Sequence, residues 1–227
     1  MKIVILAPHP DDEVYGCGGS ILKWIDEGHD VHIIYVTDNR ALISWGQKSG
    51  ELIEEEAKQF LNLNEDEIAK IGLKEAEDVA KAFGFVENKV HLLKFHDLDA
   101  INQLELGISL SKEFLKDTQR IVIPPSDKDG HPDHHATHLI AKGVAKELGL
   151  TKAEFYVYYM NPMNAPKEKR AKIRMAEYRE KLYEIMAIYK TQLCLKAANF
   201  GWPTLKQRRA EYFGVFKFED MDKYSDF

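Results

Sequence analysis

Two short segments rich in histidine and aspartate carry the residues of this sequence best suited to metal chemistry. The first is HPDDE at residues 9–13, and the second is DGHPDHH at residues 129–135. A histidine and a carboxylate from the first segment, with a histidine from the second, can hold one divalent ion and leave positions open for water and substrate. Zinc held in this way lowers the pKa of a bound water toward about 7 and polarises a carbonyl group. Hydrolysis of an amide needs both effects.

Each segment also has a structural explanation. Asp12 or Glu13 could cap a helix that begins near Gly16, and His131 and His134 could lie at a helix start without binding a ligand. Both segments, however, directly follow predicted strands. This shared position favours a common site over two unrelated helix starts.

The other histidines are interpreted differently. Three of them lie in predicted turns or strands without acidic partners in register, and we expect structural roles for them: His29, His32 and His91. His138 follows His134 by four residues, the spacing of paired ligands on one helix face, but His135 occupies the position of the glutamate in that zincin motif. We therefore expect His138 to lie near the site without binding metal.

Alternating strands and helices are expected to position the two segments. Apolar and β-branched runs predict strands at residues 2–6, 31–36, 90–95, 120–123 and 155–159. Helices are predicted from near Gly16 to Gly28 and at residues 51–60, 71–83, 103–116, 136–148 and 166–189, with a loop at residues 44–50. This pattern predicts an α/β fold with a doubly wound, mostly parallel, Rossmann-like sheet flanked by helices. Ligands of such sheets bind outside the carboxyl ends of the strands, where both segments lie.

Whole-chain properties narrow the classes of protein and partner. A chain of 227 residues, 44% hydrophobic and 30% charged, predicts one globular domain over residues 1–227. A net charge of −6 without a basic stripe argues against nucleic acid, and no apolar run approaches the roughly 18 residues of a membrane span. Cys17 and Cys194 lack paired spacing, and residues 1–8 lack a signal-peptide pattern, so we expect a cytoplasmic protein. A homo-oligomer is left open.

The motifs resemble those of the PIG-L, or LmbE-like, family of zinc-dependent N-acetylglucosaminyl deacetylases. The family motif Ala-His-Pro-Asp-Asp-Glu is similar to residues 8–13, except that Pro8 replaces the alanine, and its His-Pro-Asp-His motif is intact at residues 131–134. The glycine-rich residues 16–19 are also similar to the family. Weaker similarity extends through residues 189–192 and 209–213.

This resemblance implies a ligand set and an activity. His9, Asp12 and His134 would bind the metal, with zinc expected and another divalent metal such as iron as the alternative. The enzyme would remove an N-acetyl or other N-acyl group from a small amino sugar, a sugar conjugate or a short chitooligosaccharide.

The resemblance also implies three catalytic roles. Asp11 would act as general base, and His131 would stabilise the oxyanion or protonate the leaving amine, with Asp133 as its orienting partner. The chemistry agrees, because a carboxylate beside a metal ligand can reach the attacking water, and a cationic imidazole opposite it suits developing negative charge.

Departures from the family concern the substrate pocket. Residues 37–40 replace a Thr-x-Gly-Glu segment, residues 72–76 lack an expected arginine, and residues 40–70 resemble an enlarged insertion of undetermined role. The candidates for the pocket wall are Arg40, Trp45, His96 and Asp97.

Three alternatives remain open from the sequence. Two histidines and one carboxylate are also the ligands of non-haem iron oxygenases. Gly16-x-Gly18-Gly19 before a helix, with Asp38 after the second strand, is weakly similar to a nucleotide-binding Rossmann motif. A non-catalytic metal-binding protein would keep the ligands but would not need Asp11.

Overall fold

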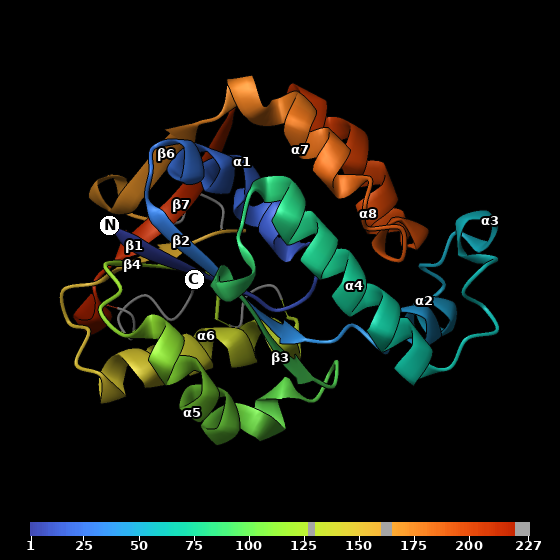
Figure 1. The fold of residues 1–227 in the computed structure, drawn as a ribbon, viewed down its shortest axis with the longest axis horizontal. Helices are drawn as coiled ribbons and strands as arrows, with labels where there is room; N and C mark the ends of the chain where they lie inside the picture. The colour runs from blue at the N-terminus through green and yellow to red at the C-terminus, as the bar shows by residue number, and fades with distance from the viewer. Residues whose placement is uncertain (127–129, 160–164, 221–227) are drawn as a thin grey trace.

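The computed structural model describes residues 1–126, 130–159 and 165–220. Within these residues a seven-stranded sheet lies between two layers of helices (Figure 1). The strands are β1 Lys2–Ala7, β2 Asp30–Thr37, β3 Val90–Phe95, β4 Arg120–Ile123, β5 Glu154–Val157, β6 Arg170–Arg174 and β7 Ala210–Phe216. Their spatial order is β3-β2-β1-β4-β5-β7-β6, with parallel pairing from β3 to β5 and antiparallel pairing of β7 with β5 and β6.

Helices cover both faces of the sheet (Figure 1). One face carries α1 Asp12–Asp26, α4 Glu65–Phe83 and α7 Arg179–Met186, and the other carries α5 Leu104–Leu115 and α6 Pro132–Glu147. The described residues also form α2 Leu42–Ser49, α3 Glu54–Ala57 and α8 Lys196–Gly201.

Strand β1 shows why the central strands are apolar throughout. Ile3 and Ile5 belong to the core that includes α1 and α4, whereas Val4 and Leu6 belong to the core that includes α6. Successive side chains of a strand point to opposite faces, so a strand covered on both faces needs a continuous apolar run.

The five strands predicted from the sequence are present, and the mostly parallel sheet flanked by helices is confirmed. The sheet is not strictly Rossmann-like, because β7 runs antiparallel and joins β6 at the edge. The single domain over residues 1–227 stays a prediction. Among the described residues, no helix combines the length and apolarity needed to cross a membrane.

Several predicted element boundaries were wrong. Residues 44–50, predicted as a loop, lie largely in α2, and the helix predicted at residues 51–60 is reduced to α3. Helix α4 begins earlier than predicted because Asn64 and Glu67 form a capping box. It ends as predicted at Phe83, followed by the C-cap residue Gly84, whose φ is 105°. The single helix predicted at residues 166–189 is replaced by β6 and α7, because β6 pairs with the distant β7.

Candidate active site

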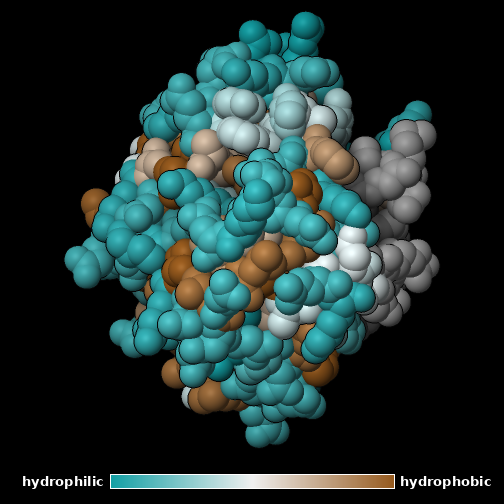
Figure 2. Space-filling model, turned by 90° about the vertical axis from the view of Figure 1, so that its right-hand side faces the viewer, coloured by the Kyte–Doolittle hydropathy of each residue, from teal (hydrophilic) through white to brown (hydrophobic). Residues whose placement is uncertain are grey.

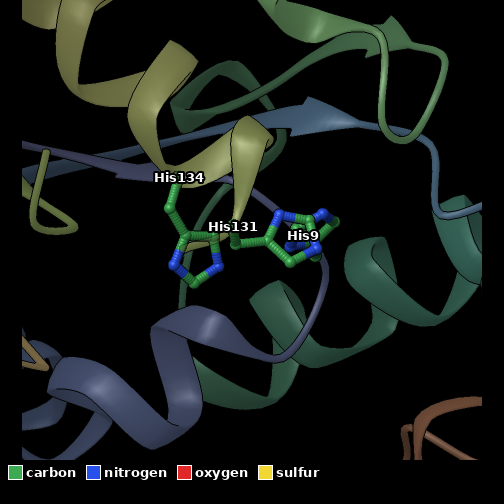
Figure 3. A group of neighbouring side chains, drawn as sticks. All are labelled: His9, His131 and His134. Carbon is green, nitrogen blue, oxygen red and sulfur yellow. The ribbon is translucent and has the colours of Figure 1, made fainter. Parts of the chain in front are cut away.

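The two chemistry-bearing segments meet at the carboxyl ends of β1 and β4. The strand order reverses between these two strands, which is the usual position of a ligand crevice in a parallel sheet. His9 follows β1, and His131 and His134 lie at the start of α6, with His131 as the N-cap residue (Figure 3). The centroid of the His131 ring lies 4.6 Å from that of His9 and 5.0 Å from that of His134. Asp129 lies outside the described residues.

Asp12 lies between two of these histidines. Its Oδ2 atom is 3.1 Å from His9 Nδ1 and 3.3 Å from His134 Nε2. Two ligands at about 2.0–2.1 Å from a tetrahedral zinc ion are separated by roughly 3.3 Å. Oδ2 of Asp12 therefore lies at about this separation from one ring nitrogen of each predicted histidine ligand.

Two overlapping groups of side chains place potential ligand atoms within 4.8 Å of one another. One group contains His9, His131 and His134, and the other contains His9, Asp97 and Asp133. The hydrogen bonds of each residue decide which of these side chains is free to bind an ion.

Asp133 is committed to the protein scaffold. Its buried carboxylate accepts backbone N–H groups from Leu98 at 2.7 Å and Ala100 at 3.2 Å, and it lies 3.1 Å from His9 Nε2. A proton on Nε2 leaves Nδ1 of His9 to face Asp12, and such carboxylate contacts orient metal-binding histidines. Asp133 was predicted to orient His131, but its carboxylate lies 4.0 Å from His131 Nδ1 and contacts His9 instead.

Asp97 has a similar structural commitment. Its carboxylate accepts the backbone N–H of Asn39 at 3.0 Å and that of Ala41 at 3.2 Å, which fixes the turn after β2. Each of its oxygens thus holds one backbone N–H of this turn. We therefore interpret Asp97 and Asp133, the two carboxylates that share the second group with His9, as support for the site and not as ligands.

Asp11 is held in an unusual backbone conformation beside the predicted ligands. Its φ is 120°, which costs free energy for a residue other than glycine, and its N–H donates to Glu13 Oε2 at 3.1 Å. The other oxygen of Glu13 accepts the hydroxyl groups of Tyr189 at 2.6 Å and Tyr35 at 3.1 Å. Asp11 thus faces the pocket from a backbone that Glu13 and two tyrosines hold in place.

Charges within the site divide its carboxyl groups into two kinds. Burial favours the neutral form of Asp12, but His134 and His9 outweigh it and hold its pKa well below the usual range. Burial, together with Asp12 and Glu13, raises the pKa of Asp11 well above its usual range. Burial also raises the pKa of Glu13 to about 7. Asp12 is therefore suited to bind a cation, and Asp11 is suited to accept a proton.

The histidines also differ in charge. Burial opposes the charged form of His9, but hydrogen bonds to Asp12 and Asp133 raise its pKa well above the usual range. Burial, with His9 and His134, lowers the pKa of His131 to about 4. The N–H of Asp133 donates to Nδ1 of His131 at 3.3 Å, so the neutral ring carries its proton on Nε2. The expected cationic His131 is thus replaced by a neutral hydrogen-bond donor.

A pocket of about 290 Å³ opens beside these residues, lined by His9, Asp11, Asp12 and His131. Figure 2 views the side of the molecule on which α2 and α8 lie in Figure 1, where an apolar band crosses the surface between hydrophilic side chains. Two further lining residues, Asn39 and Gln192, were not predicted from the sequence. Among the described residues, the amide nitrogens of both side chains are buried without a hydrogen-bond partner.

The predicted pocket wall is only partly correct. Trp45 and Asp97 line the pocket, and His96 lines a neighbouring hollow. The prediction that Arg40 lines the pocket was wrong. Its guanidinium hydrogen-bonds to Asp38 and forms an ion pair with Asp66. His138, as expected, lies outside both ligand groups, and its Nδ1 lies 3.0 Å from the carbonyl oxygen of Pro124.

The glycines of α1 serve packing. A Cβ atom on Gly16 would lie 2.5 Å from the ring of Tyr158, and one on Gly19 would lie 2.3 Å from Met175. Asp38, the candidate ribose-binding carboxylate, is buried and pairs with Arg40. These contacts explain the glycines without a nucleotide phosphate.

The chain is similar in sequence to known proteins. A family model described as PIG-L: GlcNAc-PI de-N-acetylase matches residues 4–145. A diacetylchitobiose deacetylase from Thermococcus kodakarensis is 30% identical over 148 residues, 63% of this chain and 49% of that protein, so this chain spans about half the length of that curated relative.

Solved structures share the fold. An N,N'-diacetylchitobiose deacetylase from Pyrococcus horikoshii has a TM-score of 0.73 and 21% identity, covering 96% of this chain and 85% of that one. A deacetylase involved in the teicoplanin biosynthetic pathway has a TM-score of 0.68 and 16% identity, covering 96% and 98%. At these identities the likeness shows the fold alone.

Proposed function

This chain belongs to the PIG-L family, and we propose that it hydrolyses the N-acetyl group of a small amino sugar, sugar conjugate or short chitooligosaccharide. The observation that carries the proposal is the position of Asp12 Oδ2 between His9 Nδ1 and His134 Nε2, beside a pocket that Asp11 also lines. The relatives named as deacetylases of N-acetylated sugars support the same reaction.

His9, Asp12 and His134 would hold the divalent ion, which we propose is zinc, with iron as the alternative. Two imidazoles and one carboxylate suit either ion. Asp12 is a better third ligand than His131, because its depressed pKa keeps it ionised and it lies within 3.3 Å of both other ligands. When bound, the ion would lower the pKa of a water molecule and polarise the acetamide carbonyl.

Asp11 is the general base of the proposed reaction. Its carboxylate takes a proton from the attacking water and can return it to the departing amine. The hydrogen bond from its N–H to Glu13 keeps the strained backbone in place, so the carboxylate needs no reorganisation during the reaction.

His131 stabilises the negative charge that develops on the carbonyl oxygen. Its Nδ1 accepts the N–H of Asp133, so Nε2 carries the proton and would donate the hydrogen bond to that oxygen. The aspartate therefore fixes the tautomer of His131 through its backbone and the orientation of His9 through its side chain.

Three pocket residues support a sugar as substrate. Within the described part of the chain, the buried amide nitrogens of Asn39 and Gln192 have no hydrogen-bond partner. The soft terminal torsion of an amide allows each N–H to turn toward a ligand oxygen. Trp45 adds an exposed aromatic surface at the rim. A hydroxyl-rich ring provides acceptors for both amides.

The alternative functions gain no support from the family match. The match favours neither an iron oxygenase nor a nucleotide-binding protein. A purely metal-binding role would not explain why Glu13 holds the backbone of Asp11. The cytoplasmic location, the absence of a nucleic-acid partner and a homo-oligomeric state stay predictions.

Acetate release tests the proposed reaction. Zinc-loaded protein should release acetate without oxygen from N-acetylglucosamine or N,N'-diacetylchitobiose, and it should release much less from acetyl-lysine peptides. Acetate from the peptides, with none from any sugar, would contradict the substrate class. Turnover that required oxygen would instead favour the oxygenase.

A further inference from the structure

Helix α1 is broken near its start, and two charged side chains from the other end of the chain bind at the break. Cys17 has φ −151° and ψ 19°, far from the helical values near −63° and −42°. The turn before the break, residues 12–16, begins with the proposed ligand Asp12. We infer that Arg208 and Glu211 form a clip that positions this turn for metal binding and catalysis. The inference rests on the proposed ligand set, and it makes both clip residues positioning residues.

Glu211 binds the part of α1 that follows the break. It belongs to β7, which runs beside α1 (Figure 1), and its buried carboxylate accepts the N–H of Gly19 at 2.9 Å and that of Ser20 at 2.7 Å. The Ser20 hydroxyl donates to the same carboxylate at 2.6 Å. The first N–H groups of a helix have no partner within the helix, and a negative charge there interacts favourably with the helix dipole. Glu211 therefore caps the second part of α1 from a distant strand.

Arg208 binds the part of α1 that precedes the break. Its Nη1 donates to the carbonyl oxygen of Tyr15 and lies 3.7 Å from Glu211 Oε1. The last carbonyl groups of a helical segment also lack partners within it, and basic side chains satisfy them well. The clip thus bonds the end of the first turn and the start of the second part at once.

The break has an energetic cost that packing alone does not explain. Glu211 is buried, and burial raises the pKa of its carboxyl group. A buried carboxylate loses its hydration, whereas an unbroken helix bonds its own N–H groups without any buried charge. What the break provides is a separate orientation for residues 12–16. Unfavourable local arrangements of this kind cluster at functional sites.

The first turn connects the clip directly to the proposed general base. Val14 and Tyr15 donate their N–H groups to the carbonyl oxygen of Asp11 at 2.9 and 3.1 Å. The carbonyl oxygen of Tyr15 is in turn the group that Arg208 binds. A displacement at the clip therefore reaches Asp11 through one residue. The φ of 120° at Asp11 persists only while such surrounding contacts restrain it.

Zinc affinity provides the first test, because it does not depend on the reaction. The zinc dissociation constants of wild type and Glu211→Gln are measured by competition with a chelator. The amide of the variant presents an N–H group to one of the two backbone donors, so part of the cap is lost. The constant should rise about 3- to 10-fold, less than the 10- to 100-fold typical when a group that contacts a metal ligand is lost. Ser20→Ala removes only the hydroxyl bond, preserves the fold and should give a smaller rise.

Two controls separate positioning from general stability. Val79→Ala truncates a buried side chain of α4 in the same core, and it should lower the free energy of unfolding without changing zinc affinity. Tyr178→Phe removes the 2.9 Å hydrogen bond to Asp26 at the far end of α1 and should also leave zinc affinity unchanged. Wild-type zinc affinity in both Glu211→Gln and Ser20→Ala, or an equal loss in Val79→Ala, would overturn the inference.

Kinetics at saturating zinc provide the second test. Arg208→Met should lower kcat for acetate release about tenfold with KM unchanged, because the turn that carries the base loses its restraint. Arg208→Lys keeps a positive charge and a donor for Tyr15, so it should recover most of the lost kcat. A loss in kcat that Arg208→Lys does not recover, or a change confined to KM, would contradict positioning by the clip.

Amide hydrogen exchange tests the same coupling from the other direction. Coupling between two sites is reciprocal, so a clip that strengthens zinc binding must itself be stabilised by bound zinc. Zinc should slow exchange of the Gly19 and Ser20 amides more than that of Val79, and this difference should disappear in His134→Ala. Slowed exchange without acetate release would support the clip and contradict only the proposed reaction. Equal effects of zinc on all three amides would overturn the clip even if acetate is released.

Discussion

Two clusters of histidines lie at opposite ends of the same sheet, and they have opposite surroundings. At the carboxyl ends of the strands, His9 contacts the carboxylates of Asp12 and Asp133 at 3.1 Å each. Toward the amino ends, His32 and His91 on the neighbouring strands β2 and β3 stack with their ring centroids 5.7 Å apart.

The second cluster is surrounded by lysine and aromatic groups. Burial, His32, Lys2 and Lys89 lower the pKa of His91 to about 4, and its ring stacks on Phe114 with the centroids 3.7 Å apart. His32 does have an acidic neighbour, contrary to the sequence-based expectation, because Asp30 lies 3.2 Å away, but Lys89 shares that carboxylate. Both clusters contain histidines, so histidines alone do not identify a candidate metal site. The buried carboxylates beside His9 distinguish the candidate site from the packed rings of His32 and His91.

The largest expected difference between the two ends concerns Asp11. Asp11→Asn should lower kcat by about 10²- to 10⁴-fold while metal content stays normal, because an amide cannot accept the proton of the attacking water. Asp30→Asn makes the same chemical change at the other end and should leave kcat near the wild-type value. Steady-state kinetics at equal metal content provide the measurement. A wild-type rate in Asp11→Asn would contradict the assignment of Asp11 as general base.

His131 provides the next largest effect. His131→Ala should lower kcat by about 10²- to 10³-fold, because the developing oxyanion loses the Nε2–H donor. The control variant His91→Ala removes a ring at the amino ends of the strands and should leave kcat unchanged. Combined with Asp11→Asn, the His131 effect should be less than additive, since both residues act on one intermediate. Full additivity in the double variant would indicate separate steps.

A smaller loss is expected when the support of Asp11 is weakened. Tyr189→Phe removes the 2.6 Å hydrogen bond to Glu13 and should lower kcat about tenfold with KM unchanged, because the Asp11 backbone loses part of its restraint. Tyr35→Phe removes a longer bond and should have a smaller effect. Tyr183→Phe on α7 is the control, as its ring packs on Trp202. Equal kcat values in all three variants would show that Glu13 does not position the base.

The smallest effect concerns stability at the amino end. The folded-state pKa of His91, about 4, lies below its usual value near 6.5, so the unfolded chain binds more protons between these two pH values. The His91 contribution should therefore lower the free energy of unfolding as the pH falls from about 6.5 to 4. Urea unfolding across this range should show a shallower decline for His91→Phe than for wild type. Identical slopes would place His91 in a more solvated environment than the structure does.

The sequence predicted elements that depend on local pattern. The five parallel strands were recognisable because each is a short apolar run, and the two metal segments because their residues are adjacent in the chain. Strands β6 and β7 were missed because each is specified by pairing with the other, some 40 residues away.

The missed parts of the site also depend on tertiary contacts. Asn39 enters the pocket because Asp97, from the end of β3, binds its backbone N–H. Gln192 is fixed because the adjacent Thr191 donates its N–H to Glu75 of α4 at 3.1 Å. Sequence spacing gives no sign of either contact. The weak family similarity at residues 189–192 was the one signal that included Gln192.

Metal analysis of single variants tests the central claim most directly. Purified wild-type protein and variants are loaded with zinc, dialysed and analysed by mass spectrometry for bound metal. His9→Ala, Asp12→Ala and His134→Ala should each lose most of the metal, because a three-ligand site loses one anchor. His91→Ala and His138→Ala should retain it, and so should His131→Ala. Full metal content in two of the first three variants, or loss in His131→Ala with retention in Asp12→Ala, would contradict the proposed ligand set.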